Sequence, residues 1–249
     1  MNKQFVHFRA VLYLVGAFGL FASAAFTELV VVIVGPPGSG KGTQTTMLRD
    51  KLDWLLISPS GILREEKLKN TDLGQIRTDY RYNQDIKDRM KLAALTDKMA
   101  QEPGMKPAKG FIVDSWPKSP NGIRFAMGSV FRERDILVVE LTVDDNTLIA
   151  RALKRKLCTK ASCGLSYGEH YTEKDKGYCD FCQSPLWQRP KDNPTDFPNR
   201  IDKYRKNVEV MKRKYKDYGI DVQSIDGSRN KNEVHEDILK IVNKHAAGI

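Results

Sequence analysis

Acidic residues are missing from the first 27 positions of this 249-residue chain, which contain only Lys3 and Arg9 as basic side chains of fixed charge. Residues 10–26 form an uncharged, largely apolar run, a pattern typical of a targeting segment. The run is short for a membrane span, which needs about 20 residues, and Ala22-Ser23-Ala24 offers a cleavage site. We expect a secretory signal peptide at 1–27. An uncleaved membrane anchor, an organelle presequence such as a mitochondrial one, and a core helix are the alternatives.

Cysteine is also scarce, since the only four lie between Cys158 and Cys182, which excludes a disulfide-rich scaffold. Internal repeats, Gly/Ser linkers and low-complexity bias are missing, which excludes fibrous and disordered classes. The length suits one compact α/β domain or two small ones, and it is sufficient for a substantial core. The net charge of +10 favours anionic partners such as nucleotides, nucleic acid or an acidic membrane.

Five short runs rich in Val, Ile and Leu predict an α/β fold with a parallel sheet covered by helices on both faces. They span 29–34, 54–57, 111–113, 136–141 and 220–225. Two late segments predict amphipathic helices. Their apolar stripes are Ile201, Tyr204, Val208, Met211 and Tyr215, and Val234, Ile238, Ile241 and Val242. The stretches from about 60 to 98 and from about 156 to 196 lack strand runs and are candidate insertions.

The clearest motif follows the first apolar run. Residues 35–43 read Gly-Pro-Pro-Gly-Ser-Gly-Lys-Gly-Thr, between a predicted strand and a predicted helix, which is the context of a P-loop. The backbone N–H groups of such a loop point at phosphate oxygens, and the helix start adds its positive dipole end. We expect Lys41 to bridge the β- and γ-phosphates. The predicted nucleotide-binding positions are Gly38, Ser39, Gly40, Lys41, Gly42 and Thr43.

A second apolar strand ends in a carboxylate, Asp114. In P-loop enzymes an acidic residue at this place holds Mg²⁺ directly or through water. The P-loop elsewhere in the chain makes this otherwise weak signal specific, so we expect Asp114 to be a water-mediated magnesium ligand. The sequence has no Asn-Lys-x-Asp motif, which argues against a G protein.

Three segments resemble the adenylate kinase family in order and spacing: 35–44, then Gly-Phe-Ile-Val-Asp-Ser-Trp-Pro-Lys at 110–118, then Ile-Asp-Gly at 225–227. The resemblance covers Val30 to about Asn243. It implies a P-loop three-layer fold with a five-stranded parallel sheet in a core of 28–57, 99–155 and 197–249. It further implies a helical monophosphate-binding insertion at about 58–98 and a small zinc-ribbon-like lid at about 156–196.

The lid segment contains all four cysteines, spaced C-x4-C-x15-C-x2-C. Two such knuckles can hold one tetrahedral Zn²⁺ as thiolates, and the segment resembles the zinc-bearing lid of long-form adenylate kinases. We therefore expect a structural zinc ion on Cys158, Cys163, Cys179 and Cys182. Disulfides and free thiols are the alternatives, and a disulfide would be favoured if the leader delivers the chain to an oxidising compartment.

The resemblance also implies an activity, the reversible transfer of the γ-phosphoryl group from Mg-ATP to a nucleoside monophosphate, preferably AMP, by a monomer. Arginine suits this transfer because its planar fork grips two phosphate oxygens. By resemblance, Arg155, Arg189 and Arg200 close over the moving group together with Lys41 and Asp114. The further ATP contacts implied are Arg151, Ser166, Tyr167 and Arg229. The monophosphate contacts implied are Ser60, Arg64, Gln84, Ile86, Asp88, Lys118, Arg189 and Arg200.

The acceptor side departs from the family pattern at three positions. Lys118 stands where the family has arginine, Gly122 where it has a glutamine that reads adenine, and Pro59 or Ser60 where it has threonine. A monophosphate kinase of other base specificity, including one with GTP as donor, is therefore an alternative, as is a nucleotide-binding relic. A nucleic-acid-binding zinc ribbon is disfavoured by the P-loop, so we expect no specific nucleic acid, and a membrane partner only if the leader stays attached.

Overall fold

The structure is a computed structural model that describes residues 28–68, 88–93, 96, 110–160, 163, 165–168 and 171–248, with the backbone alone for 64–68. The leader at 1–27 and two predicted acceptor residues, Gln84 and Ile86, lie outside the described residues. None of the described helices combines the length and the apolar character that crossing a bilayer requires.

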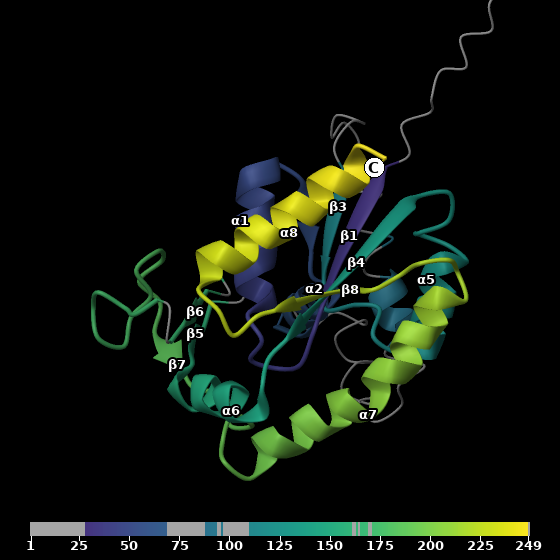
Figure 1. Ribbon diagram of the computed structural model, residues 1–249. Coiled ribbons are helices and arrows are strands. Elements are labelled where there is room, and N and C mark those ends of the chain that lie inside the picture. Colours follow the sequence, from purple (N-terminus) through teal and green to yellow (C-terminus); the bar gives the residue numbers. More distant parts are fainter. Residues whose placement is uncertain are drawn as a thin grey trace, which may run out of the picture.

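The predicted parallel sheet is present, with strand order β2-β3-β1-β4-β8 (Figure 1). Its strands are β1 (Leu29–Val34), β2 (Leu55–Ile57), β3 (Phe111–Asp114), β4 (Asp135–Thr142) and β8 (Gln223–Asp226). The sequence placed the start of the last strand too early, at 220. The reason is that the N–H of Ile220 donates to the carbonyl of Tyr215 and closes the end of the preceding helix (3.1 Å). The strand expected at 54–57 likewise begins one residue later.

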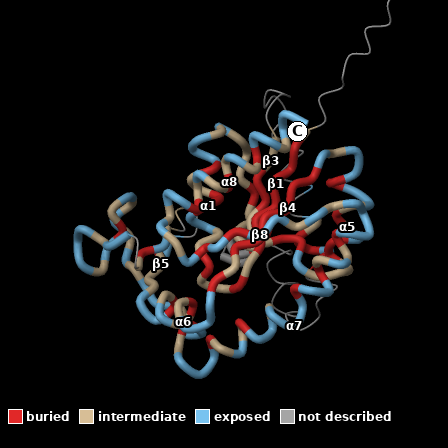
Figure 2. Tube along the Cα trace, in the orientation of Figure 1, coloured by how far each residue is buried: buried red, intermediate tan, exposed pale blue. Residues whose placement is uncertain are grey.

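The central strand β1 is buried along its whole length because it is covered on both faces. Its even positions, Val30 to Val34, pack with α5 (Pro120–Met127) and α7 (Asp196–Lys216), and its odd positions, Leu29 to Ile33, pack with α1 (Lys41–Leu52) and α8 (Lys231–Ala246). The buried positions follow β1, β3 and β4 through the middle of the molecule (Figure 2). This confirms the three-layer arrangement.

Both late amphipathic helices are confirmed as α7 and α8. On α7 the buried residues include Ile201, Val208, Met211 and Tyr215, while the ring of Tyr204 is partly buried and its hydroxyl donates to Glu140. The buried residues of α8 are Val234, Ile238 and Val242. The 3.6-residue period therefore predicted correctly which side of each helix faces the sheet.

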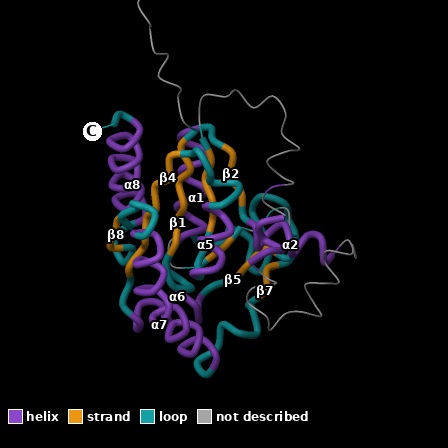
Figure 3. Tube along the Cα trace, turned by 90° about the vertical axis from the view of Figure 1, so that its right-hand side faces the viewer, coloured by secondary structure: helices purple, strands orange, loops and turns teal. Residues whose placement is uncertain are grey.

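Two regions depart from the alternation of strands and helices. The first begins with α2 (Pro59–Leu68). The second follows α6 (Asp145–Lys154) and contains β5 (Lys156–Cys158), β6 (Ser166–Tyr167) and β7 (Leu186–Trp187), which form a separate antiparallel sheet. Figure 3 shows β5 and β7 apart from the strands of the large sheet. Leu148 and Ala152 of α6 pack against Phe197 and Ile201 of α7, so the two helices that flank the small sheet are in contact.

Candidate active site at the P-loop

The predicted P-loop joins β1 to α1 at the carboxyl edge of the large sheet. Gly38 and Gly40 adopt φ values of 87° and 91°, a region that favours glycine. A Cβ atom at Gly35 would lie 2.7 Å from the carbonyl oxygen of Leu141 and 2.7 Å from Ser39 Oγ, so only glycine fits there. The loop and the first turn of α1 contain all the predicted phosphate-binding positions from Gly38 to Thr43.

Lys41 is the first residue of α1, and its Nζ donates to the carbonyl of Pro36 (2.6 Å) and to Ser39 Oγ (3.3 Å). Burial lowers the pKa of Lys41 to about 7; the charge of Asp114 opposes this shift. Three cations reinforce the shift and therefore lie close enough to act on the ammonium: Lys118, Arg155 and Arg200. Positive charge thus converges on the P-loop, as a polyphosphate site requires.

Asp114 ends β3 next to the P-loop strand, opposite Ile33 of β1. Its carboxylate accepts hydrogen bonds from Ser115 Oγ (2.7 Å) and Ser58 Oγ (3.3 Å). The N–H of Ser115 donates to the carbonyl of Ile33 (3.0 Å), which fixes the chain directly after Asp114 beside the P-loop. Carboxylate oxygens are ligands that Mg²⁺ prefers, so Asp114 fits the predicted magnesium role by chemistry and by position.

Two of the predicted arginines meet at a carboxylate that the sequence did not single out as a site residue, Asp192. Arg155 donates to Asp192 Oδ2 from Nη2 (2.6 Å) and Nε (3.0 Å), and Arg200 donates from Nη1 to Oδ1 (2.6 Å). The Asp192 side chain is 0% exposed. The third arginine, Arg189, belongs to the same turn, because its carbonyl accepts from the N–H of Asp192 (2.9 Å). The sequence did offer a signal for this role, because Asp192 is an acidic residue between the predicted site arginines Arg189 and Arg200.

The other predicted donor-side residues lie on three segments around this cluster. Arg151 of α6 donates from Nη1 to the carbonyl of Gly227 (2.8 Å) and from Nη2 to that of Ser228 (3.0 Å), which ties α6 to the loop after β8. Arg229 in that loop pairs with Asp237 of α8 (2.6 Å). Ser166 is exposed on β6, whereas the side chain of its neighbour Tyr167 is buried.

The four cysteines converge in the small sheet, with all four Sγ atoms within 4.8 Å of one another. The Sγ atoms of Cys158 and Cys182 are 3.4 Å apart, and those of Cys163 and Cys179 are 3.6 Å apart. A tetrahedral zinc ion with Zn–S bonds of about 2.3 Å separates its sulfurs by about 3.8 Å, whereas a disulfide bond is only about 2.05 Å long. The cluster therefore fits a zinc site with four cysteine ligands. The Tyr167 hydroxyl donates to Cys179 Sγ (3.2 Å) at its edge.

On the acceptor side, Lys118 follows β3; the residue as a whole is exposed, but burial of its ammonium lowers the pKa of Lys118. The carboxylates of Asp114 and Asp88 lie close enough to interact with its charge. Asp88 is buried and accepts a short hydrogen bond from Ser119 Oγ, and a Cβ atom at Gly122 would lie 3.2 Å from its Cγ. The structure thus brings Lys118 and Asp88 together.

The other predicted acceptor residues are placed less fully. Ser60 lies in the first turn of α2 and is partly buried. For Arg64 only the backbone is described, within the same helix, and Gln84 and Ile86 are outside the described residues.

Comparisons with known proteins agree with this geometry. A family model described as "Adenylate kinase" matches residues 33–220. Among curated proteins, an adenylate kinase of Clostridioides difficile is 31% identical over 219 residues, which is 84% of this chain and 96% of the relative. Adenylate kinases of Symbiobacterium thermophilum and Methanosarcina mazei are each 30% identical, over 85% and 87% of this chain and 97% and 99% of their own lengths.

Proposed function

Since the chain belongs to the adenylate kinase family, and is thereby a nucleoside monophosphate kinase that transfers a phosphoryl group from ATP to AMP, we propose which of its residues perform that transfer. The observation that carries the proposal is the convergence of charge on Lys41. Asp114, Lys118, Arg155 and Arg200 all act on its ammonium, although they come from separate parts of the chain. Phosphoryl transfer needs two anionic substrates held in line and the charge of the moving group neutralised, and the cations of this cluster supply the neutralising charge.

On the donor side, the backbone N–H groups of Gly38 to Thr43 bind the ATP phosphates and Lys41 clamps the β- and γ-phosphates. Arg155, Arg189 and Arg200 close over the transferring group and neutralise its charge. Arg151 lies against the ATP base, and Ser166 and the backbones of Tyr167 and Arg229 complete the contacts. The buried ring of Tyr167 supports a backbone contact there, because its hydroxyl is engaged within the small sheet.

The family uses Mg²⁺ with ATP, where the ion neutralises charge on the β- and γ-phosphate oxygens. Asp114 is the residue proposed to hold it through water. Its two serine partners orient the carboxylate at the sheet edge beside the P-loop. On the acceptor side, Lys118 and Arg64 bind the monophosphate, Ser60 and Asp88 support the pocket, and Gln84 and Ile86 line the base. Arg189 and Arg200 contact both substrates.

The segment at about 156–196, which contains the small sheet, is proposed to be a lid that closes over ATP and excludes water, with about 58–98 as the monophosphate-binding insertion. We propose that Cys158, Cys163, Cys179 and Cys182 hold one structural zinc ion, supported by the mutual closeness of their sulfurs. Among the described residues of this small sheet region, the buried cluster consists of Cys158, Tyr167 and Cys179, so a zinc ion held by the cysteines would add stability where the apolar core is small. We further propose that the catalytic unit is a monomer and that residues 1–27 are a targeting segment outside it.

The test is a coupled assay on the full chain with Mg-ATP and AMP, CMP, UMP or GMP supplied separately. We expect AMP to support the highest kcat/KM. A different best acceptor would mean that the pocket around Gly122 and Asp88 selects another base. A protein that binds ATP but turns over none of the four would be a nucleotide-binding relic.

Lys41→Ala provides the site control in the same assay. Removing one charged donor at the transferring phosphate costs about 10²- to 10³-fold in kcat. Lys51→Ala, at an exposed position on the same helix, should leave turnover unchanged. Equal rates for Lys41→Ala and the native protein would contradict the site.

A further inference from the structure

We infer that Tyr215 is a positioning residue for Lys118 and thereby for the acceptor phosphate, a conclusion that rests on the proposed role of Lys118. Tyr215 lies in the last turn of α7, and its hydroxyl donates to the carbonyl of Pro117 (3.1 Å). Pro117 directly precedes Lys118, although Tyr215 is 98 residues away along the chain. The bond therefore joins the acceptor loop to a helix that is distant in sequence.

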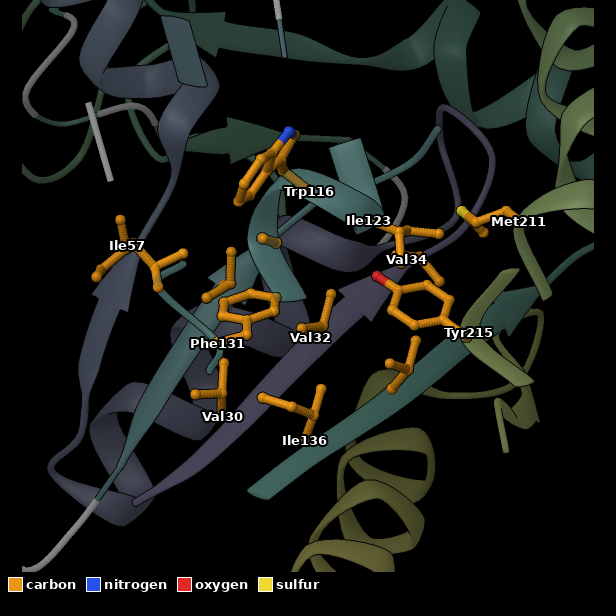
Figure 4. Close-up of a cluster of buried hydrophobic side chains, with 14 of the residues drawn as sticks. Val30, Val32, Val34, Ile57, Trp116, Ile123, Phe131, Ile136, Met211 and Tyr215 are labelled. Atoms are coloured by element: carbon orange, nitrogen blue, oxygen red, sulfur yellow. The ribbon is translucent and has the colours of Figure 1, made fainter. Parts of the chain in front are cut away.

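Tyr215 is fully buried, and its ring packs with Val34, Ile123 and Met211 in the cluster between the sheet and α5 and α7 (Figure 4). Burial raises the pKa of its hydroxyl, so the group stays neutral and remains a donor across the working pH range. A buried donor aimed at a buried backbone carbonyl is held in one geometry, because neither partner has water as a substitute.

In the short loop at 115–118, each of the three residues that precede Lys118 is held by a different part of the molecule. The N–H of Ser115 is bonded to β1, and the Trp116 side chain is buried edge-on against Phe131 (6.2 Å between ring centroids). Tyr215 holds Pro117. Lys118 itself has a long flexible stem, so the place of its ammonium depends on how firmly the preceding peptide is fixed.

The same helix also carries Arg200, 15 residues before Tyr215. At 1.5 Å per residue the two are separated by about 22 Å of continuous helix. One end of α7 therefore presents a proposed transfer arginine, and the other end holds the loop of the proposed acceptor lysine. One rigid helix therefore anchors both the backbone that carries Arg200 and the loop that carries Lys118.

The experiment is steady-state kinetics on the full chain with AMP and Mg-ATP varied separately. For Tyr215→Phe we expect the KM for AMP to rise about three- to tenfold, the size of one hydrogen bond, while kcat and the KM for ATP change less than about twofold. The matched control is Tyr204→Phe, which also removes a tyrosine hydroxyl from α7. That hydroxyl donates to Glu140 and not to the loop at 115–118. The control variant should leave the KM for AMP unchanged.

Lys118→Gln separates failure of this inference from failure of the proposed site. If Lys118→Gln leaves the KM for AMP unchanged, the acceptor role of Lys118 is wrong. If Lys118→Gln raises that KM and Tyr215→Phe does not, or if Tyr204→Phe raises it equally, Tyr215 has only a structural role. In the double variant, Tyr215→Phe should add nothing to the effect of Lys118→Gln, and full additivity would also overturn the inference.

Circular dichroism checks that each variant is folded at the assay temperature. Should Tyr215→Phe be unfolded there, the comparison is made with all variants at the lower temperature at which it is folded. The ratio of its KM for AMP to that of the native chain is then the deciding quantity.

Discussion

Arg155 and Arg200 share the buried carboxylate of Asp192, with both shortest contacts at 2.6 Å. One arginine caps the end of α6 and the other lies near the start of α7, so the shared carboxylate holds two elements together as well as two charges. The guanidinium groups keep their remaining donors for other partners. In this geometry Asp192 orients the two arginines before substrates arrive.

Asp192→Asn tests this orientation. The amide keeps the size of the side chain but loses its charge, so the two arginines repel each other without a shared counter-charge. We expect kcat to fall about tenfold or more, because misplacing a group that stabilises the transferring phosphate has a cost of that order. Asp202→Asn, at an exposed position on α7, is the control. A lowered melting temperature with native kcat would mean that Asp192 acts on stability alone.

Lys118→Arg tests the departure from the family pattern at the acceptor phosphate. A planar guanidinium can bind two phosphate oxygens where the lysine ammonium acts as a single charge. We expect the KM for AMP to fall about two- to fivefold, with the KM for ATP unchanged. Titration of AMP at saturating Mg-ATP measures this directly. An unchanged KM would mean that acceptor binding is organised by other residues.

ATP binding should depend on pH through Lys41. The pKa of its ammonium is about 7 in the free protein, and a bound polyphosphate raises it by adding nearby negative charge. Binding above pH 7 therefore takes up a proton, and the affinity for ATP should fall as the pH rises above that value. Phosphate monoesters ionise near about pH 6, so the nucleotide itself contributes little to this change at higher pH.

Isothermal titration calorimetry in buffers of different ionisation heat measures the proton uptake. Lys41→Arg is the matched variant, because arginine keeps its charge throughout this range. Its ATP affinity should be flat between about pH 7 and pH 9. Identical pH profiles for the variant and the native chain would exclude Lys41 as the titrating group.

Metal analysis of the purified chain should find one zinc ion per molecule if the four cysteines act as ligands. Cys158→Ser should lose the zinc and lower the melting temperature of the small sheet, since metal binding is coupled to its folding. Thr172→Ala, at an exposed position between the two cysteine pairs, is a control outside the ligand set. A metal-free native sample with an unchanged melting curve in the cysteine variant would favour free thiols.

The local parts of this protein were predictable because their signals are short in sequence. Strand β1 was predicted with its observed bounds, because an unbroken apolar run indicates a strand that is buried on both faces. The P-loop was predictable because its glycines, with positive φ at Gly38 and Gly40, form a short motif directly between a strand and a helix. The cysteine spacing similarly indicated four converging sulfurs, which the structure places together. The predicted start of β8 at residue 220 was wrong because α7 ends in a turn that the apolar pattern does not reveal.

By itself, the sequence determined the five strands of the large sheet, the phosphate-binding loop and the residue types of the site, because apolar periodicity and short motifs are local patterns. It did not reveal the short strands β5, β6 and β7, which lack apolar runs. Only the tertiary structure decided that Arg155 and Arg200 meet on Asp192 and that Tyr215 bonds to Pro117. These partners depend on how α6 and α7 pack against each other and against the sheet. Side chains from distant segments become neighbours only when those packed surfaces fix their separation.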